Sequence, residues 1–234
     1  MNYSLALIVI VSACTGDKSE TQADGGKDST GTSGTRTAKA DVIDSLADNI
    51  ALAHFKDFHN RTEALTAETE TFCSSPTSDG LEAVRSAWWA ARTPWKHAEL
   101  IQFGPMVEYP DRLGPKIDDW PVNERAVEDK LTSEDPLDLD AFKVMGSATR
   151  GLPVIEFLLW GPGAETLSQF ETVSRRCEML TGASQDVQAN AALLITSWSE
   201  DWYDQLRGQA EGDGLVFKDE KDVVDQWVNR LIFT

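Results

Sequence analysis

The spacing of apolar residues in the middle of the chain restricts the fold more than any other feature. Between residues 81 and 101 they recur every three or four positions, at Leu81, Val84, Trp88, Ala91, Trp95, Ala98 and Ile101. This period places their side chains on one face of an α-helix. No stretch of useful length in the 234 residues alternates apolar and polar residues as a half-buried strand does. The sequence therefore predicts an all-α protein.

Similar spacing predicts further helices over residues 41–70, 122–131, 137–149, 153–160, 167–180, 187–202 and 223–232. We expect a break at residues 74–80, a kink or interruption at Pro94, and a second break near Gly182. Residues 103–121 are rich in Gly and Pro, which predicts a long ordered loop of the kind that carries a site. Together these elements predict a bundle with antiparallel neighbours.

The N-terminal residues have the pattern of an exported protein. The apolar run from Leu5 to Val11 is too short to span a bilayer and fits an export signal. Residues 11–14, Val-Ser-Ala-Cys, resemble the lipobox of bacterial lipoproteins, which implies cleavage and a lipid on Cys14. An ordinary signal peptide with a chance cysteine is the alternative, since no Lys or Arg precedes the apolar run.

The next segment, residues 15–39, is dominated by Gly, Ser, Thr and Asp and predicts a flexible linker. Thr15 directly after the cysteine resembles lipoproteins sorted to the outer membrane. Residues 1–14 are thus interpreted as the signal segment, residues 15–39 as a tether, and residues 40–234 as one helical domain. The expected location is the cell envelope, on the outer membrane facing the periplasm or the cell surface.

The charge balance excludes one class of partner. The chain has 21 basic and 39 acidic side chains and a net charge of −18. Binding to nucleic acid through its phosphates requires a basic surface, so we expect no nucleic-acid partner. An acidic surface is compatible with cations, or with solubility alone.

Three cysteines are present. If Cys14 carries lipid, Cys73 and Cys177 form an even pair in an oxidising compartment, where a disulfide is expected. A metal site is the competing interpretation, but neither residue has a CxxC or a neighbouring His partner.

Glu156 is the one acidic residue in the largely apolar stretch of residues 149–163. A buried carboxylate needs a partner or a ligand, and two interpretations are open. It pairs with Arg85 or Arg92 on the preceding long helix, or it binds a ligand. The histidines His54, His59 and His97 are expected at the surface, and neither an HExxH nor a GxSxG motif is present.

Several motifs occur in an order that resembles the imelysin family of bacterial envelope proteins. They are Ser86 to Trp95 with Arg92, Phe103-Gly104-Pro105, Ile117-Asp118-Asp119-Trp120-Pro121, and residues 151–159, which begin Gly151-Leu152-Pro153 and include Glu156. The resemblance covers residues 41–234. It implies a helical fold of two similar bundles, export, and an association with iron regulation and uptake, and the founding member is described as a metallopeptidase. The family signature, GxHxxE, provides a His and a Glu as metal ligands.

The signature is degenerate in this chain. Gly151 and Glu156 match it, but the histidine position is Pro153, which has no side-chain donor atom. The GLP form resembles a lipoprotein branch of the family, which the pair Cys73 and Cys177 also fits. The remaining candidates to join Glu156 around a cation are Asp118 and Asp119, and an exposed turn with capping carboxylates is their alternative.

These observations favour a lipid-anchored, imelysin-like protein that binds a ligand, iron or another divalent cation, and has no peptidase activity. A metallopeptidase and a structural or partner-binding lipoprotein are the alternatives. The tryptophans, Trp88, Trp89, Trp95 and Trp160 among them, are expected in the bundle core. Imelysin-like proteins continue into a second bundle, so we expect either a shortened copy or a protein partner on the apolar helix at residues 223–232.

Overall fold

The computed structural model describes residues 37–161, 166–207 and 216–233, and these residues contain helices and no strand. The predicted all-α class is therefore confirmed. Cys14, the export signal and nearly all of the predicted tether lie outside the described residues. Within the described ranges, every helix is too short or too polar to cross a bilayer.

The longer helices follow from the predicted segments. α1 (Ala38–Ser45), the π-helix η1 (Leu46–Leu52) and α2 (Ala53–Ser74) follow one another without a gap. The other elements are α3 (Ser78–Ala98), η2 (Gly104–Met106), α4 (Leu113–Ile117), α5 (Glu124–Thr132), α6 (Leu139–Lys143), η3 (Ser147–Thr149), α7 (Leu152–Trp160), α8 (Thr166–Thr172), α9 (Ser174–Ser197), η4 (Trp198–Trp202), α10 (Tyr203–Arg207) and α11 (Glu220–Phe233).

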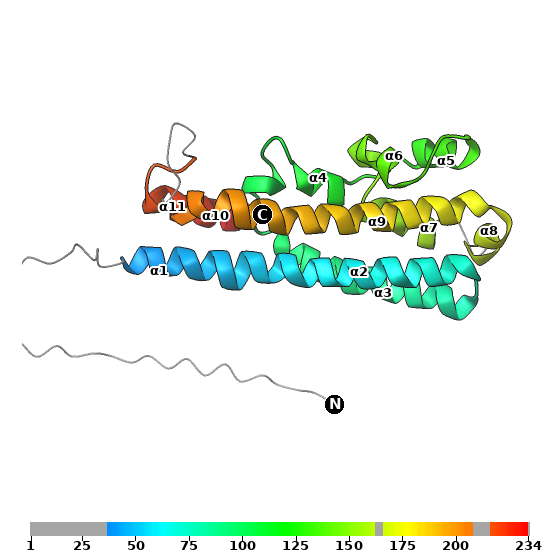
Figure 1. Ribbon diagram of the computed structural model, residues 1–234, viewed down its shortest axis with the longest axis horizontal. Helices are drawn as coiled ribbons and strands as arrows, with labels where there is room; N and C mark the ends of the chain where they lie inside the picture. The colour runs from blue at the N-terminus through cyan, green and yellow to red at the C-terminus, as the bar shows by residue number, and fades with distance from the viewer. Residues whose placement is uncertain (1–36, 162–165, 208–215, 234) are drawn as a thin grey trace, which may run out of the picture. The chain divides into compact units, whose positions relative to one another are not determined.

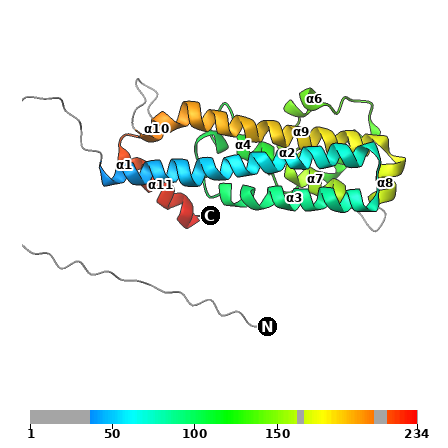
Figure 2. The same ribbon diagram turned by 60° about the horizontal axis from the view of Figure 1, so that its bottom comes forward.

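Three long helices form the frame. α2 packs between α3 and α9 and runs antiparallel to both (Figures 1 and 2). α7 packs against α3 and α9, while α4, α5 and α6 contact α9 (Figure 1). α11 lies beside α1 and α10, at the end of the frame away from α8 (Figure 1). The predicted antiparallel bundle is confirmed, and the segment from η2 to α7 covers it.

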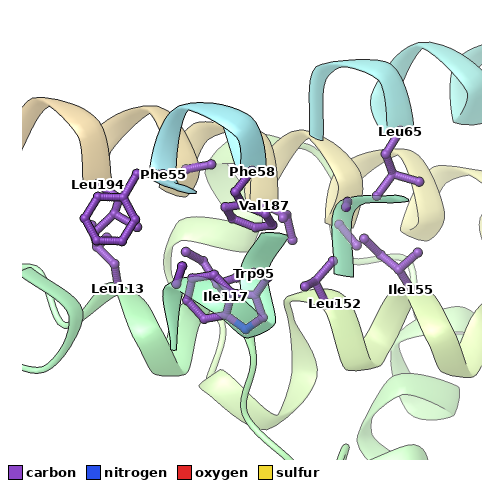
Figure 3. Close-up of a cluster of buried hydrophobic side chains, with 14 of the residues drawn as sticks. Phe55, Phe58, Leu65, Trp95, Leu113, Ile117, Leu152, Ile155, Val187 and Leu194 are labelled. Atoms are coloured by element: carbon purple, nitrogen blue, oxygen red, sulfur yellow. The ribbon is translucent and has the colours of Figure 1, made fainter. Parts of the chain in front are cut away.

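Sequence spacing explains the frame. The predicted break at residues 74–80 is present, and the Thr77 side chain caps α3 by accepting a hydrogen bond from the Gly80 amide at 3.1 Å. The apolar faces of α2, α3, α4, α7 and α9 meet in one core (Figure 3). Phe58 of α2 and Trp95 of α3, both buried, have ring centroids 5.0 Å apart in this core.

A disulfide joins Cys73 at the end of α2 to Cys177 in the first turn of α9. This confirms the predicted pairing. The bond holds the C-terminal end of α2 against the N-terminal end of α9, although the two cysteines are 104 positions apart in the sequence.

The predicted break at Gly182 is wrong, because α9 passes through it. A Cβ atom at this position would lie 2.2 Å from the Leu137 carbonyl oxygen and 2.5 Å from the Phe142 ring. The glycine therefore allows residues 137–142 to pack directly onto the helix. Pro94 likewise does not interrupt α3, where it is buried inside a single helix. Within residues 103–121, expected to be a loop, a short helix α4 forms and buries Leu113 and Ile117.

Candidate functional site: the cleft beside α7

The start of α7 is set by Gly151 and Pro153. Gly151 precedes the helix at a φ of +84°, a conformation that favours glycine. A Cβ atom there would lie 2.4 Å from the carbonyl oxygen of Ile117, the last residue of α4. Pro153 lies in the first turn, where its missing amide hydrogen leaves no helical bond unmade. The motif thus joins α7 to α4 at close range.

One turn further on, Glu156 lies on the wall of a cleft of about 480 Å³. The cleft separates α7 from the segment that follows α4 and leads into α5. It is lined by Trp120, Pro121, Val122, Glu124, Pro153, Glu156, Phe157, Trp160 and Gly161. Two carboxylates and three aromatic rings are present, and none of these nine residues is basic. The cleft can therefore attract a cation.

Glu156 is half-buried and has no hydrogen bond or ion pair to any part of the described chain. The expected partners have other contacts. Arg85 donates from Nε to the Leu159 carbonyl oxygen at 3.1 Å and pairs with Glu82. Arg92 pairs with Asp118. The hypothesis that one of these arginines neutralises Glu156 is not supported by the structure.

Asp118 has a structural set of partners from α3. Its Oδ2 accepts hydrogen bonds from Trp95 Nε1 at 2.8 Å, from Lys96 Nζ at 3.2 Å, and from Arg92. Only 3% of its side chain is exposed. Burial works to raise the pKa of Asp118, but hydrogen bonding with Glu99 and the charges of Arg92 and Lys96 lower it below the ordinary value. Asp118 is thus an ionised anchor for the loop.

Glu99 completes this cluster, and sequence analysis missed it. Lys96 Nζ donates to both Glu99 and Asp118, so the two carboxyl groups lie around one ammonium. Burial, and then the neighbouring Asp118, raise the pKa of Glu99. Its separation of three residues from Lys96 on a helix was the available signal. Asp118 lies in a loop that is distant in the sequence from Lys96 and Glu99, and no local pattern indicates that it joins them.

The structure does not bring Asp118 and Asp119 together with Glu156. Asp119 accepts a hydrogen bond from Ser147, which ties its loop to η3. Trp120 and Pro121, joined by a cis peptide bond, are the part of this motif that lines the cleft. Across residues 37–161, 166–207 and 216–233, no group of three or more His, Cys, Asp or Glu side chains could hold a metal ion.

The tryptophans divide between core and surface. Trp88 and Trp95 are buried as expected, but Trp89, Trp120 and Trp160 are 59%, 74% and 37% exposed. Trp160 packs edge-on against Trp88 at 5.1 Å, which holds one aromatic wall of the cleft in place. The prediction of a core position is therefore wrong for Trp89, Trp120 and Trp160, which lie where the bundle meets solvent.

Two histidines meet across the bundle. The rings of His54 on α2 and His97 on α3 have centroids 5.1 Å apart. Burial, and then the neighbouring His97, lower the pKa of His54. The other motif residues, Gly104 and Pro105, are buried in η2 and have structural positions.

The fold and the cleft define an all-helical protein with an acidic, aromatic pocket beside a degenerate GxHxxE helix. The family model for imelysin matches residues 51–232, and the chain belongs to the imelysin family. The chain is 24% identical over 159 residues to the iron-regulated protein A of Synechococcus elongatus. That match covers 68% of this chain and 40% of the relative.

Two solved structures share the fold. An imelysin-like protein from Psychrobacter arcticum superposes with a TM-score of 0.68 at 19% identity, over 83% of this chain and 58% of that one. A putative iron-regulated protein A precursor from Parabacteroides distasonis gives 0.65 at 20% identity, over 83% and 57%. The chain thus spans about half of the length of these relatives.

Proposed function

We propose that this protein is a cell-envelope lipoprotein of the imelysin family that binds a cation in the α7 cleft and does not hydrolyse peptides. The observation that carries the proposal is the unpaired, half-buried Glu156 on the cleft wall. A carboxylate withdrawn from water without a counter-charge favours binding of a positive ligand.

The contrast with other carboxylates supports this choice. Asp186 has a buried arginine partner and Asp118 has three donors. Glu156 and Glu124 have neither and line the same cleft. Two carboxylates supply oxygen ligands suited to a hard cation whose remaining positions are filled by water. Iron is the first ion to test, since two of the similar proteins are named as iron-regulated.

The donor set does not fit the family's metallopeptidase signature. Pro153 has no atom that can ligate a metal, so the His and Glu pair is reduced to Glu156. A hydrolytic metal site uses three protein ligands and an open position. The chemistry of these residues therefore supports binding of a cation more than hydrolysis.

Titration of the full chain, purified in detergent, with Fe²⁺ and Mn²⁺ tests the proposal. We expect one ion per chain, and affinity reduced roughly tenfold or more in Glu156→Gln through loss of a charged ligand. Glu68→Gln, an exposed change on α2, is the matched control and should bind like the wild type. Equal affinity of wild type and Glu156→Gln would contradict the proposal, as would casein cleavage that Glu156→Gln abolishes.

The same preparation tests the lipid anchor. We expect the intact mass to correspond to a chain that begins at Cys14 and carries acyl groups, with the protein in the outer-membrane fraction. Cys14→Ser should lack the added mass. An unacylated chain from the wild-type gene would overturn the anchor and leave the cation site untouched.

A further inference from the structure

A second cavity has the opposite electrostatic character. It encloses about 270 Å³ between the loop that leads into α4, α4 itself, and the segment from α6 to Arg150. Four of its ten lining residues are basic, namely Arg112, Lys116, Lys143 and Arg150, although the whole chain has only 21 basic residues in 234. Asp111 is the only acidic residue among the ten.

Two of the four cations lack an acidic partner. Across the described residues, Lys116 makes no hydrogen bond or ion pair, and its charge acts on Asp186 only at a distance. Arg112 donates to the Tyr109 hydroxyl at 3.2 Å and stacks over its ring, both neutral contacts. Several N–H groups of these two side chains therefore remain available to a ligand.

The other two basic residues have carboxylate partners and form the frame of the cavity. Arg150, 3% exposed, pairs through two nitrogens with buried Asp186. Lys143 pairs with Asp140 at the surface. Asp111 accepts a hydrogen bond from the neutral Ser197 hydroxyl at 2.7 Å and has no cationic partner within the described part of the chain. Among the lining residues, the positive charge without an ionic partner comes from Arg112 and Lys116, and the Asp111 carboxylate offsets one of these two charges.

The two walls are held in fixed positions before any ligand binds. Leu113 and Ile117 are buried in the core, which fixes the α4 backbone that carries Lys116. The close approach of Gly151 to the Ile117 carbonyl oxygen, and the Arg150–Asp186 pair, fix the opposite wall. A site organised in advance loses less conformational entropy on binding.

The backbone at Arg112 adds a separate observation. Its φ is +42°, and it is the one non-glycine residue at positive φ in the described chain. Such a conformation is unfavourable for an arginine and is concentrated at ligand sites. Arg112 lines the cavity in this conformation, although a glycine would adopt the same backbone with less strain.

From these features we infer that the cavity is a binding site for a phosphate-type oxyanion, with Arg112 and Lys116 as its direct donors. It shares no lining residue with the α7 cleft, so it is independent of the cation site proposed above. A doubly charged oxyanion matches two separate cationic donors, because each can form a charge-assisted hydrogen bond.

Calorimetric titration of the full chain with sodium phosphate at low ionic strength, against sodium chloride, tests the inference. We expect one saturable site, weakened roughly tenfold by Lys116→Gln and by Arg112→Gly. Arg112→Gly keeps the backbone conformation, so the test survives if Lys116→Gln fails to fold. Lys56→Gln, an exposed change on α2 that removes the same charge, should bind phosphate like the wild type.

Three results would overturn the inference: no binding at millimolar phosphate, equal weakening by Lys56→Gln, or unchanged binding in both site variants. A parallel titration with glycerol phosphate distinguishes the source of the group. Tighter binding of glycerol phosphate assigns a phosphate monoester, and tighter binding of inorganic phosphate assigns the free ion. Each of these two results supports the oxyanion site.

Discussion

Two carboxylates that lie in the family motifs, Asp118 and Glu156, have very different surroundings. Asp118 is surrounded by donors from α3, whereas Glu156 has no such contact within the described ranges. Both lie in segments that mix apolar residues with single charges, so residue type alone does not separate them. The distinction comes from which distant side chains reach each carboxylate.

Asp118→Asn should destabilise the fold by about 2–3 kcal/mol near neutral pH, because Arg92 and Lys96 lose their shared charged partner. The pKa of Asp118 is lower in the folded protein than in the unfolded chain. Its stabilisation is therefore present above the unfolded value of about 3.9 and is lost as pH falls through the folded pKa.

Urea unfolding of wild type and Asp118→Asn across the acid range measures this effect. The difference in unfolding free energy should be constant near neutral pH and shrink below about pH 4. Asp129→Asn, an exposed change on α5, is the control and should show little difference at any pH. A difference for Asp118→Asn that persists unchanged into strong acid would show that its charge is not the cause.

At the scale of elements, α9 continues through Gly182, although the local sequence predicts that the helix ends there. Gly182 lowers helix propensity by about 1 kcal/mol relative to alanine, which is why a break was predicted. Residues 137–142 pack so closely onto α9 that only glycine fits, and that packing outweighs the local preference. The residues that require a glycine at position 182 lie about 40 positions earlier in the chain. Their contact with Gly182 therefore produces no periodic pattern in the local sequence.

Gly182→Ala should therefore destabilise the protein by about 1–3 kcal/mol, despite the better helix propensity of alanine. The added methyl group would displace the Leu137 carbonyl and the Phe142 ring. Gly146→Ala is the matched control, since a Cβ atom there meets nothing within 4 Å and φ is −64°. Thermal unfolding of both variants checks the prediction, and equal melting temperatures would refute it.

The helices could be predicted where the residues that define them lie close together in the sequence. The spacing from Leu81 to Ala98 and the flanking residues of α7 were sufficient to predict both helices. Glu156 was found because a lone charge among apolar residues is visible in sequence. Tertiary packing determines that Arg85 donates a hydrogen bond to the Leu159 carbonyl oxygen. It also determines that Trp89 and Trp160 are exposed. Residue type gave no indication of either.

At the scale of the whole molecule, the Cys73–Cys177 disulfide closes a covalent loop that spans 104 positions of the sequence. A double Cys73→Ala, Cys177→Ala variant should lose about 2–4 kcal/mol of unfolding free energy, because the unfolded chain gains freedom. Urea unfolding with and without reductant measures the loss. The double variant should be insensitive to reductant, and a wild type equally insensitive would contradict a contribution from the bond.

The position of α2 between α3 and α9 has a consequence for the order of assembly. The α2–α3 hairpin can form from residues close in sequence, but α9 begins 100 positions after α2 ends, at 174 against 74. The second apolar face of α2 is therefore covered only once residues 174–197 are available to fold. Until then it is an exposed apolar surface of the kind that chaperones bind.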